Sequence, residues 1–518
     1  MQSPLQSSEL SERQSTPPDR LERLRGSANL ILLSAKTPYF VWGLAATLRV
    51  REYFYNRSLW LDEAHVVLKV LAPNFWEVIA SGNWNQTLPV GMAVVMRVLV
   101  GVIGDSEYVL RLMPLLCSLL SFPLFYRISR EYLKPQLVPL ALLLFSVAPP
   151  LVYYAAEAKH YSSDVFVCLL LLVLALEVMR SDFKTKTWVL GVAACASTWF
   201  SFTSVFVSLG IAVAFGAQTL RAGRPERLAK GVPWITCWAL SLGFHYYASL
   251  RYLVSNPTLH RQWVSWGGFG PATYDSLAWA KWFVSVWFGR LPSTFGISYG
   301  YFASAFASFG AWLLLRRLRP KSYLILMPMV FLILAAAAGY YPVLTRVALF
   351  AAPLYLLALI QGIGSAMELR PLKFLGWGAT AVLSGQLFLG ATYNFVHPSV
   401  REHIRPLLTH LREKQQPEDL VYVSQYAKDA FNYSVRRHPL VGPVSIGISC
   451  RDVPLEVCEK DFLRRVVGRE RLWVLLSHVM PEEKDRLVHI ADRWGERAST
   501  VESGDTTLLL YRFKQREL

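Results

Sequence analysis

Residues 29–396 consist mostly of long hydrophobic runs that are separated by short polar turns. A helix needs about 20 apolar residues to cross the hydrocarbon core of a bilayer. The pattern therefore predicts a polytopic, α-helical membrane protein with about 11 transmembrane helices. We place these helices at 38–55, 108–126, 135–150, 165–179, two within 188–220, 232–252, 300–315, 322–338, 347–364 and 374–392.

Two further apolar segments are either spans or helices lying along the membrane interface. Residues 88–104 are interrupted by Arg97 and by glycines, and residues 276–291 are rich in Trp and Phe. The run at 108–126 is followed by Arg127, Arg130 and Lys134, so its end should face the cytoplasm. Residues 88–104 then remain on the outer side, and we interpret both segments as interfacial helices.

After residue 396 the pattern changes to shorter, mixed elements. Residues 401–416 have helical periodicity, and 425–434 form a second predicted helix. Short apolar runs at 419–424, 471–477 and 506–513 predict strands. Residues 397–518 should therefore form a separate α/β domain. Cys450 and Cys458 lie in a polar part of this domain and are either a disulfide or a free buried pair.

Composition agrees with a membrane protein, since 53% of the residues are hydrophobic and only 17% are charged. The net charge of +17 is explained by Lys- and Arg-rich turns, which all lie on one side of the predicted topology. The polar residues 1–28 should be disordered and cytoplasmic, and the C-terminal domain should be extracytoplasmic, in a protein of the cytoplasmic membrane. No zinc-finger spacing or RNA-binding signature is present, so we expect no nucleic-acid partner.

Two adjacent carboxylates, Asp62 and Glu63, follow the first predicted span in the segment LWLDEA. They could simply stabilise a helix N-terminus through its dipole. Neighbouring carboxylates in a partly dry site also repel, so that one of them can act as a general base near neutral pH. His65 is three residues after Asp62 and would share its face of a helix.

Two other outer segments carry polar groups near membrane depth, where such groups are usually functional. The segment YYAAEAKHYSSD contains Glu157, Lys159, His160 and Tyr161, which could otherwise anchor a solvated loop. A later segment, YYPVLTR, contains Tyr341 and Arg346. Arg346 either snorkels to the interface or donates to a phosphate. Lys159 would suit a phosphate as a point charge. No nucleotide-binding or HExxH motif is present.

These three segments together resemble the integral-membrane glycosyltransferases of the C-type fold (GT-C). The resemblance covers about residues 40–392 and is to the bacterial, family 39-like group of protein O-mannosyltransferases and aminoarabinose transferases. It implies a polyprenyl-phosphate-linked sugar as donor and a glycan, lipid or protein acceptor at the outer face of the membrane. It also implies inverting transfer to an acceptor hydroxyl, with Asp62 as general base and Glu63 as its support.

The resemblance also assigns binding residues. Glu157 matches an acidic residue of the second outer loop, and Lys159 and Arg346 match cations near the donor phosphate. Lys159 stands where the family usually has arginine, and His160 where it has proline, so donor identity is open at this site. Some enzymes of this type use a divalent cation and others do not, which leaves open whether a metal joins Asp62 and Glu157.

Two other function classes compete with a transferase. A transporter or flippase of lipid-linked sugars should place its acids at mid-membrane, whereas these acids lie in predicted outer loops. A non-catalytic envelope scaffold would not need Asp62, Lys159 and Arg346 at the interface. The sequence therefore favours a transferase of the cell envelope.

Overall fold

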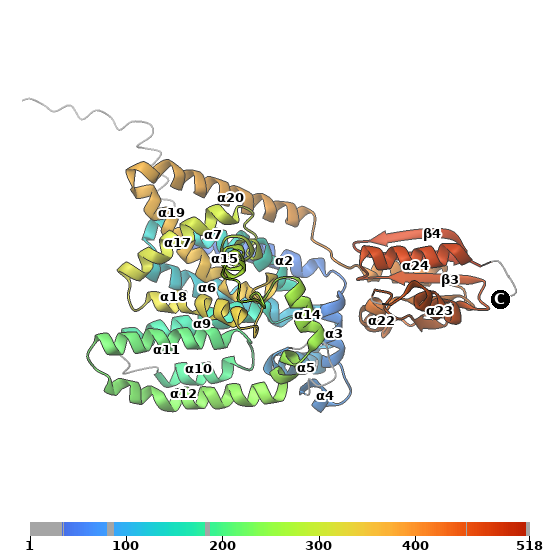
Figure 1. Cartoon of the computed structure of the whole chain (residues 1–518), viewed down its shortest axis with the longest axis horizontal. Helices are drawn as coiled ribbons and strands as arrows, with labels where there is room; N and C mark the ends of the chain where they lie inside the picture. The colour runs from blue at the N-terminus through green and yellow to red at the C-terminus, as the bar shows by residue number, and fades with distance from the viewer. Residues whose placement is uncertain (1–33, 35, 80–87, 182–186, 452, 514–518) are drawn as a thin grey trace, which may run out of the picture.

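Most of the chain is a bundle of helices with a small α/β domain at one end (Figure 1). The structure is a computed structural model, and it describes residues 34, 36–79, 88–181, 187–451 and 453–513. The predicted disordered segment 1–28 lies outside the described residues.

Every segment that was predicted to be a span is helical. These helices are α2 (Thr37–Tyr55), α6 (Glu107–Tyr132), α7 (Val138–Val147) with α8 (Pro149–Tyr153), α9 (Tyr161–Arg180), α10 (Thr187–Ser197), α11 (Ser204–Arg221), α12 (Glu226–His245), α17 (Gly300–Arg317), α18 (Ser322–Ala337), α19 (Ala352–Glu368) and α20 (Lys373–Val396). Among the described residues, five helical segments are long and apolar enough to cross a membrane, or six if the bent pair of α7 and α8 is one span. The other predicted spans are shorter or less apolar helices, so their crossing stays a prediction.

The two segments interpreted as interfacial are also helical. The first is α5 (Val90–Ile103), which has 14 residues. At 1.5 Å per residue this helix is about 21 Å long, which is shorter than the hydrocarbon core. The second comprises α15 (Ser276–Val284), the π-helix η4 (Ser285–Arg290) and α16 (Leu291–Thr294). In Figure 1, α15 is seen nearly end-on whereas α11, α12 and α20 lie in the plane, so α15 runs across the bundle.

Close helix packing in the bundle depends on small residues. Helices α17 and α19 approach each other at Gly310 and Gly362, where a Cβ on either glycine would overlap the backbone of the facing helix. Small residues allow such approach in membrane helices, where van der Waals contact replaces the hydrophobic effect as the driving force. Helix α19 is buried over almost its whole length.

The C-terminal domain contains a five-stranded sheet in the order β2-β1-β3-β5-β4. Strands β1 and β2 and strands β1 and β3 pair in parallel, and β5 pairs antiparallel with β3 and β4. The strands are β1 (Leu420–Val423), β2 (Val444–Ile446), β3 (Arg471–Leu476), β4 (Glu496–Ser503) and β5 (Thr506–Arg512). The helices are α21 (Ile404–Lys414), α22 (Lys428–Val435), α23 (Leu455–Val466) and α24 (Pro481–Trp494). The predicted strands β1, β3 and β5 and the helices α21 and α22 are thus confirmed.

The two faces of this sheet are buried in different ways. One face belongs to a hydrophobic cluster within the domain, which includes Phe462 and Leu487 and also Cys450 and Cys458. These two cysteines form a disulfide, with Cα atoms 5.5 Å apart. The other face belongs to a cluster that includes Trp473 and Phe431 but continues into the short helices of the membrane part.

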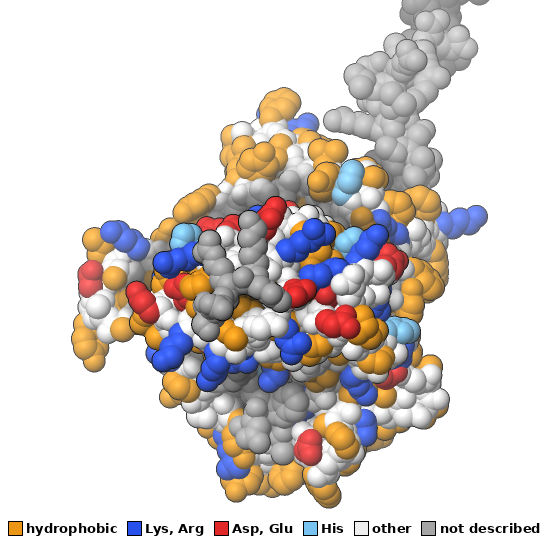
Figure 2. All heavy atoms as spheres, turned by 90° about the vertical axis from the view of Figure 1, so that its right-hand side faces the viewer, with side chains coloured by type: hydrophobic (Ala, Val, Ile, Leu, Met, Phe, Trp, Pro, Cys, Tyr) orange, Lys and Arg blue, Asp and Glu red, His pale blue; other side chains and the backbone are white. Residues whose placement is uncertain are grey.

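That shared cluster joins the C-terminal domain to α3 (Leu61–Val70), the helix that carries Asp62 and Glu63. Ala64 and Val67 of α3 are fully buried in it, together with Met92 of α5. Figure 2 views the molecule from this end and shows charged side chains of both signs across the middle and hydrophobic ones toward the rim. The α/β domain therefore has a polar outer surface and an apolar inner contact.

Candidate functional site

Asp62 and Glu63 occupy the first turn of α3, directly after its first residue Leu61. Carboxylates are favoured there because the first backbone N–H groups of a helix have no intrahelical partner and carry partial positive charge. The backbone N–H of Leu61 donates to Oε2 of Glu402, 3.1 Å away in the segment that leads into the C-terminal domain. The start of this helix is thus fixed by a group from far along the chain.

Glu63 is used structurally. Its two oxygens accept hydrogen bonds from Nε and Nη2 of Arg111 at 2.9 and 2.7 Å, and both side chains are fully buried. Oε1 also accepts from the backbone N–H of Ala158 at 2.7 Å. Burial alone would raise the pKa of Glu63, but the charge and hydrogen bonds of Arg111 outweigh it and lower that pKa. Glu63 therefore remains ionised and connects the segment LWLDEA to the segment YYAAEAKHYSSD. Its role as a support for Asp62 stays a prediction.

Asp62 has a different partner, from the late outer segment. It forms an ion pair with Nη2 of Arg346, and Asp62 is only 4% exposed. Nε of Arg346 donates to the hydroxyl of Tyr161 at 2.9 Å, and its guanidinium lies 4.9 Å from the ring centroid of Trp60. Three segments that are separated by more than 90 residues each thus meet at the pair of Asp62 and Arg346.

The second outer segment buries three titratable groups beside this pair. Glu157 is fully buried, and among the described residues neither of its oxygens has a hydrogen-bond partner. Nη2 of Arg57 lies 3.9 Å from Oε2 of Glu157. Burial, reinforced by the charge of Glu63, raises the pKa of Glu157. Burial lowers the pKa of Lys159 to about 8, against the attraction of Asp62, and lowers that of His160 to about 3.

Several residues of the site were not singled out from the sequence. Arg57 donates to Glu52 at 2.6 Å and lies 3.9 Å from the ring centroid of Tyr153. Arg401 donates to the hydroxyl of Tyr154 at 3.2 Å. Arg111 could have been identified from its position within the predicted span 108–126, because an arginine in an apolar run needs a polar or charged partner.

Two other predicted site residues, His65 and Tyr341, have partners outside the pair of Asp62 and Arg346. Nδ1 of His65 is 2.8 Å from Oδ2 of Asp429 in α22, so His65 belongs to the contact between α3 and the C-terminal domain. The hydroxyl of Tyr341 donates to the backbone carbonyl of Val347 at 3.0 Å. For both residues a direct role in substrate binding stays a prediction.

The residues of this site do not fit a divalent cation. Among the described residues no group of three or more His, Cys, Asp or Glu side chains could hold a metal ion. Asp62 already faces the guanidinium of Arg346, and Glu157 lies among Arg57, Arg346 and Arg401. A divalent metal ion between Asp62 and Glu157 would be repelled by these arginines, so the proposed reaction below uses no metal.

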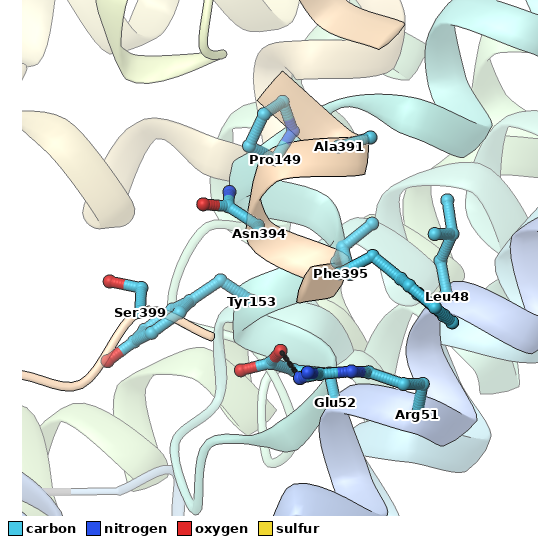
Figure 3. A pocket seen from close by; sticks show the side chains of 10 residues that line it. Leu48, Arg51, Glu52, Pro149, Tyr153, Ala391, Asn394, Phe395 and Ser399 are labelled. Carbon is cyan, nitrogen blue, oxygen red and sulfur yellow. Dashed lines mark ion pairs between the residues drawn. The ribbon is translucent and has the colours of Figure 1, made fainter. Parts of the chain in front are cut away.

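A small pocket adjoins the site between α2, α8 and the end of α20 (Figure 3). It is lined by Leu48, Arg51, Glu52, Pro149, Val152, Tyr153, Ala391, Asn394, Phe395 and Ser399. Its volume of about 20 Å³ accepts a group the size of one water molecule. A sugar therefore cannot bind in this pocket without movement of its walls.

Solved structures with a similar fold align with nearly the whole chain. ArnT from Cupriavidus metallidurans in the apo state matches with a TM-score of 0.52 and 14% identity, covering 92% of this chain and 98% of that one. The structure of that protein bound to undecaprenyl phosphate matches with a TM-score of 0.53 and 13% identity over the same shares of the two chains. The chain has the C-type glycosyltransferase fold.

The GT-C fold also relates this chain to the oligosaccharyltransferase AglB of Archaeoglobus fulgidus. Its complex with an inhibitory peptide and a dolichol-phosphate matches with a TM-score of 0.52 and 11% identity, covering 94% of this chain and 75% of that one. No family model and no curated protein sequence matches the chain. The likeness is therefore one of fold, and the chemistry has to be argued from the site.

Proposed function

We propose that this protein transfers a sugar from a polyprenyl-phosphate donor to an acceptor hydroxyl at the outer face of the cytoplasmic membrane, with inversion at the sugar carbon. The observation that carries the proposal is the ion pair of the buried Asp62 with the partly buried Arg346, beside the further cation Lys159. The fold supports it, because ArnT is solved with undecaprenyl phosphate and AglB with a dolichol-phosphate.

The charge of the site suits a phosphodiester. Five cations and four carboxylates meet here, which leaves one positive charge when all are ionised. The cations are Arg57, Arg111, Lys159, Arg346 and Arg401, and the carboxylates are Glu52, Asp62, Glu63 and Glu157. A sugar phosphodiester carries one negative charge, and binding it would neutralise the site.

The proposed reaction follows from how the donor changes the partners of Arg346. The donor phosphate takes the place of Asp62 at the guanidinium of Arg346, with Lys159 as a second cation. Asp62 is then free to accept the proton of the acceptor hydroxyl. The hydroxyl oxygen forms the new bond to the sugar carbon, the bond from that carbon to the phosphate oxygen breaks, and polyprenyl phosphate leaves with the electron pair. Positioning and electrostatic stabilisation of the phosphate supply most of the rate.

The two alternatives are less well supported. The carboxylates Asp62, Glu63 and Glu157 lie at the ends of helices. A flippase would instead need such groups in the middle of its membrane helices. A scaffold has no use for the buried cluster, which is costly to desolvate.

The proposal is tested with purified protein and a panel of polyprenyl-phosphate sugars. Release of polyprenyl phosphate is measured, because one molecule is released for each sugar that is transferred. This holds for any acceptor hydroxyl and also for transfer to water. We expect release from one class of donor, and strong loss in Arg346→Ala but not in Arg437→Ala, an arginine that pairs with Asp105 away from the site. Movement of donor lipid between leaflets without release would instead support the flippase.

Donor binding should also depend on pH through Lys159. Its pKa is about 8, so its charge is present below pH 8 and lost above it. We expect affinity for the donor to fall as the pH rises from 7 to 9.5, and Lys159→Arg to remove most of this dependence because arginine stays charged. The effect of Lys159 on folding stability changes with pH in the opposite direction to its effect on donor binding. An unfolded lysine binds its proton up to about pH 10.4, so this group favours the folded state more as pH rises between the two values. Equal pH dependence of binding in wild type and Lys159→Arg would exclude Lys159 from the phosphate site.

A further inference from the structure

Arg401 lies in the short segment between α20 and α21, where the chain enters the C-terminal domain. Its Nη2 atom donates to the Tyr154 hydroxyl at 3.2 Å, and its guanidinium lies 4.6 Å from the ring centroid of Trp60 and 5.2 Å from that of Tyr153. Among the described residues these partners are all neutral, and Arg401 forms no ion pair. A partly buried guanidinium that is not ion-paired is unusual, because charges removed from water are normally paired. The charge of Glu157 acts on Arg401 only from beyond ion-pair distance.

A second guanidinium lies beside the same aromatic ring. Arg346 is 4.9 Å from the centroid of Trp60, and each of the two arginines disfavours the charge of the other. Asp62 forms an ion pair with Arg346. In the proposed reaction Asp62 leaves Arg346, so the repulsion between the two arginines is then offset less, by the nearby charge of Glu157. An anion that contacts both guanidinium groups would remove this repulsion.

Trp60 adds a neutral donor at the same place. Its side chain is only 5% exposed, and its Nε1–H has no hydrogen-bond partner among the described residues. A buried donor left without an acceptor is unfavourable, because it has lost its hydrogen bonds to water. A group with several acceptor oxygens beside Trp60 would satisfy this donor and both arginines.

We propose that Arg401 is a further ligand of the donor phosphate, acting with Arg346 and the Nε1–H of Trp60, so that the C-terminal domain takes part in donor binding. This inference rests on the proposed function and extends it to a residue outside the membrane part of the chain.

The neighbouring residues hold Arg401 at the site. Glu402 is 3% exposed, and its carboxylate accepts from the backbone N–H of Leu61 at 3.1 Å and from Oγ of Ser477 at 3.2 Å. Nδ1 of His478 lies 2.6 Å from its other oxygen. The carboxylate thus bonds both the first turn of the Asp62 helix and the end of β3. Glu402 is a positioning residue for Arg401, because its bonds to Leu61 and to Ser477 hold the neighbouring backbone between α3 and the C-terminal sheet.

Arg405, in the first turn of α21, offers a matched control. It donates to Oε1 of Glu107 at 2.7 Å and to the backbone carbonyl of Asn56 at 3.1 Å, so it also joins the C-terminal domain to the membrane part. Its charge, however, is already paired with a carboxylate. If Arg401 only helps to dock the domain, the Arg401→Ala and Arg405→Ala variants should behave alike.

The test measures binding of undecaprenyl phosphate to the full chain in detergent by thermal stabilisation, with the neutral undecaprenol and inorganic phosphate as parallel probes. We expect the apparent Kd for undecaprenyl phosphate to rise roughly tenfold to hundredfold in Arg401→Ala, because a charge-assisted hydrogen bond is lost. Arg401→Lys should lose less, and Arg405→Ala should bind like wild type. The melting temperature without ligand reports folding, and Arg401→Gln replaces Arg401→Ala if the latter does not fold.

The outcomes separate the two proposals. Weakening that is equal in Arg401→Ala and Arg405→Ala, or absent in Arg401→Ala, overturns the role of Arg401, and loss of binding in Arg346→Ala then still supports the proposed function. Equal stabilisation of wild type by undecaprenyl phosphate and undecaprenol overturns the proposed function itself. A response to inorganic phosphate that Arg401→Ala also loses supports the contact between Arg401 and a phosphate group without the prenyl chain.

Discussion

Replacing Asp62 with Asn is expected to lower sugar transfer by roughly 10²- to 10⁴-fold, which is the usual contribution of a general base. Asn keeps the shape of the side chain and its place in the first turn of α3, but it cannot accept a proton. It also releases Arg346 from its ion pair. Undecaprenyl phosphate should therefore bind Asp62→Asn at least as tightly as wild type, because it no longer competes with a carboxylate for Arg346.

The combination of lost turnover and retained or improved binding separates a catalytic role from a structural one. Asp429→Asn is a matched control, since Asp429 is a carboxylate bonded to His65 at the contact between α3 and α22. We expect this variant to keep most of its transfer activity. Polyprenyl phosphate release at the wild-type rate from Asp62→Asn would show that another group accepts the proton.

Glu63→Gln is expected to have the largest effect on stability. The change leaves the guanidinium of Arg111 buried, with no counter-charge at the distance of 2.7 Å that Glu63 provides. Loss of one partner from a buried ion pair typically costs about 3–5 kcal/mol. We expect a clear fall in the melting temperature in detergent, together with loss of activity because Asp62 lies on the same helical turn.

Glu107→Gln is the comparison for this effect. Glu107 also pairs with an arginine, Arg405, at 2.7 Å, but the Arg405 side chain is 41% exposed. Ion pairs in contact with water contribute about 0–1 kcal/mol. A melting temperature of Glu63→Gln no lower than that of Glu107→Gln would mean that Arg111 finds another partner or access to water.

The positions of the membrane helices could be predicted because they depend on local hydrophobicity. A helix satisfies its own backbone hydrogen bonds in lipid, so an apolar run of sufficient length determines the element without knowledge of its neighbours. Strands β2 and β4 could not be found in this way. Strand β4, with the sequence ERASTVES, is largely polar and mostly exposed, and only pairing with β5 makes it a strand.

The candidate site, too, could be predicted only where local sequence is sufficient. Asp62, Lys159 and Arg346 could be proposed because charged groups beside apolar runs are costly and are therefore usually functional. Their partners depend on tertiary contacts between distant segments, so the pairing of Glu63 with Arg111 could not be read from the sequence. Arg401 and Glu402 lie in a polar segment, where charged residues are ordinary and carry no signal. His65 was placed with Asp62 by helical spacing, but spacing does not show which domain packs against that face.

The bond between Glu402 and the backbone of Leu61 has a consequence for how the protein is made. Glu402 also bonds Ser477 and His478, which follow β3 near the end of the chain. The helix that carries Asp62 is synthesised early, yet the groups that hold its first turn emerge only after more than 300 further residues. A nascent chain therefore cannot have its finished site while the membrane helices are still being inserted. Assembly of the site is delayed until the last quarter of the chain has been synthesised and folded.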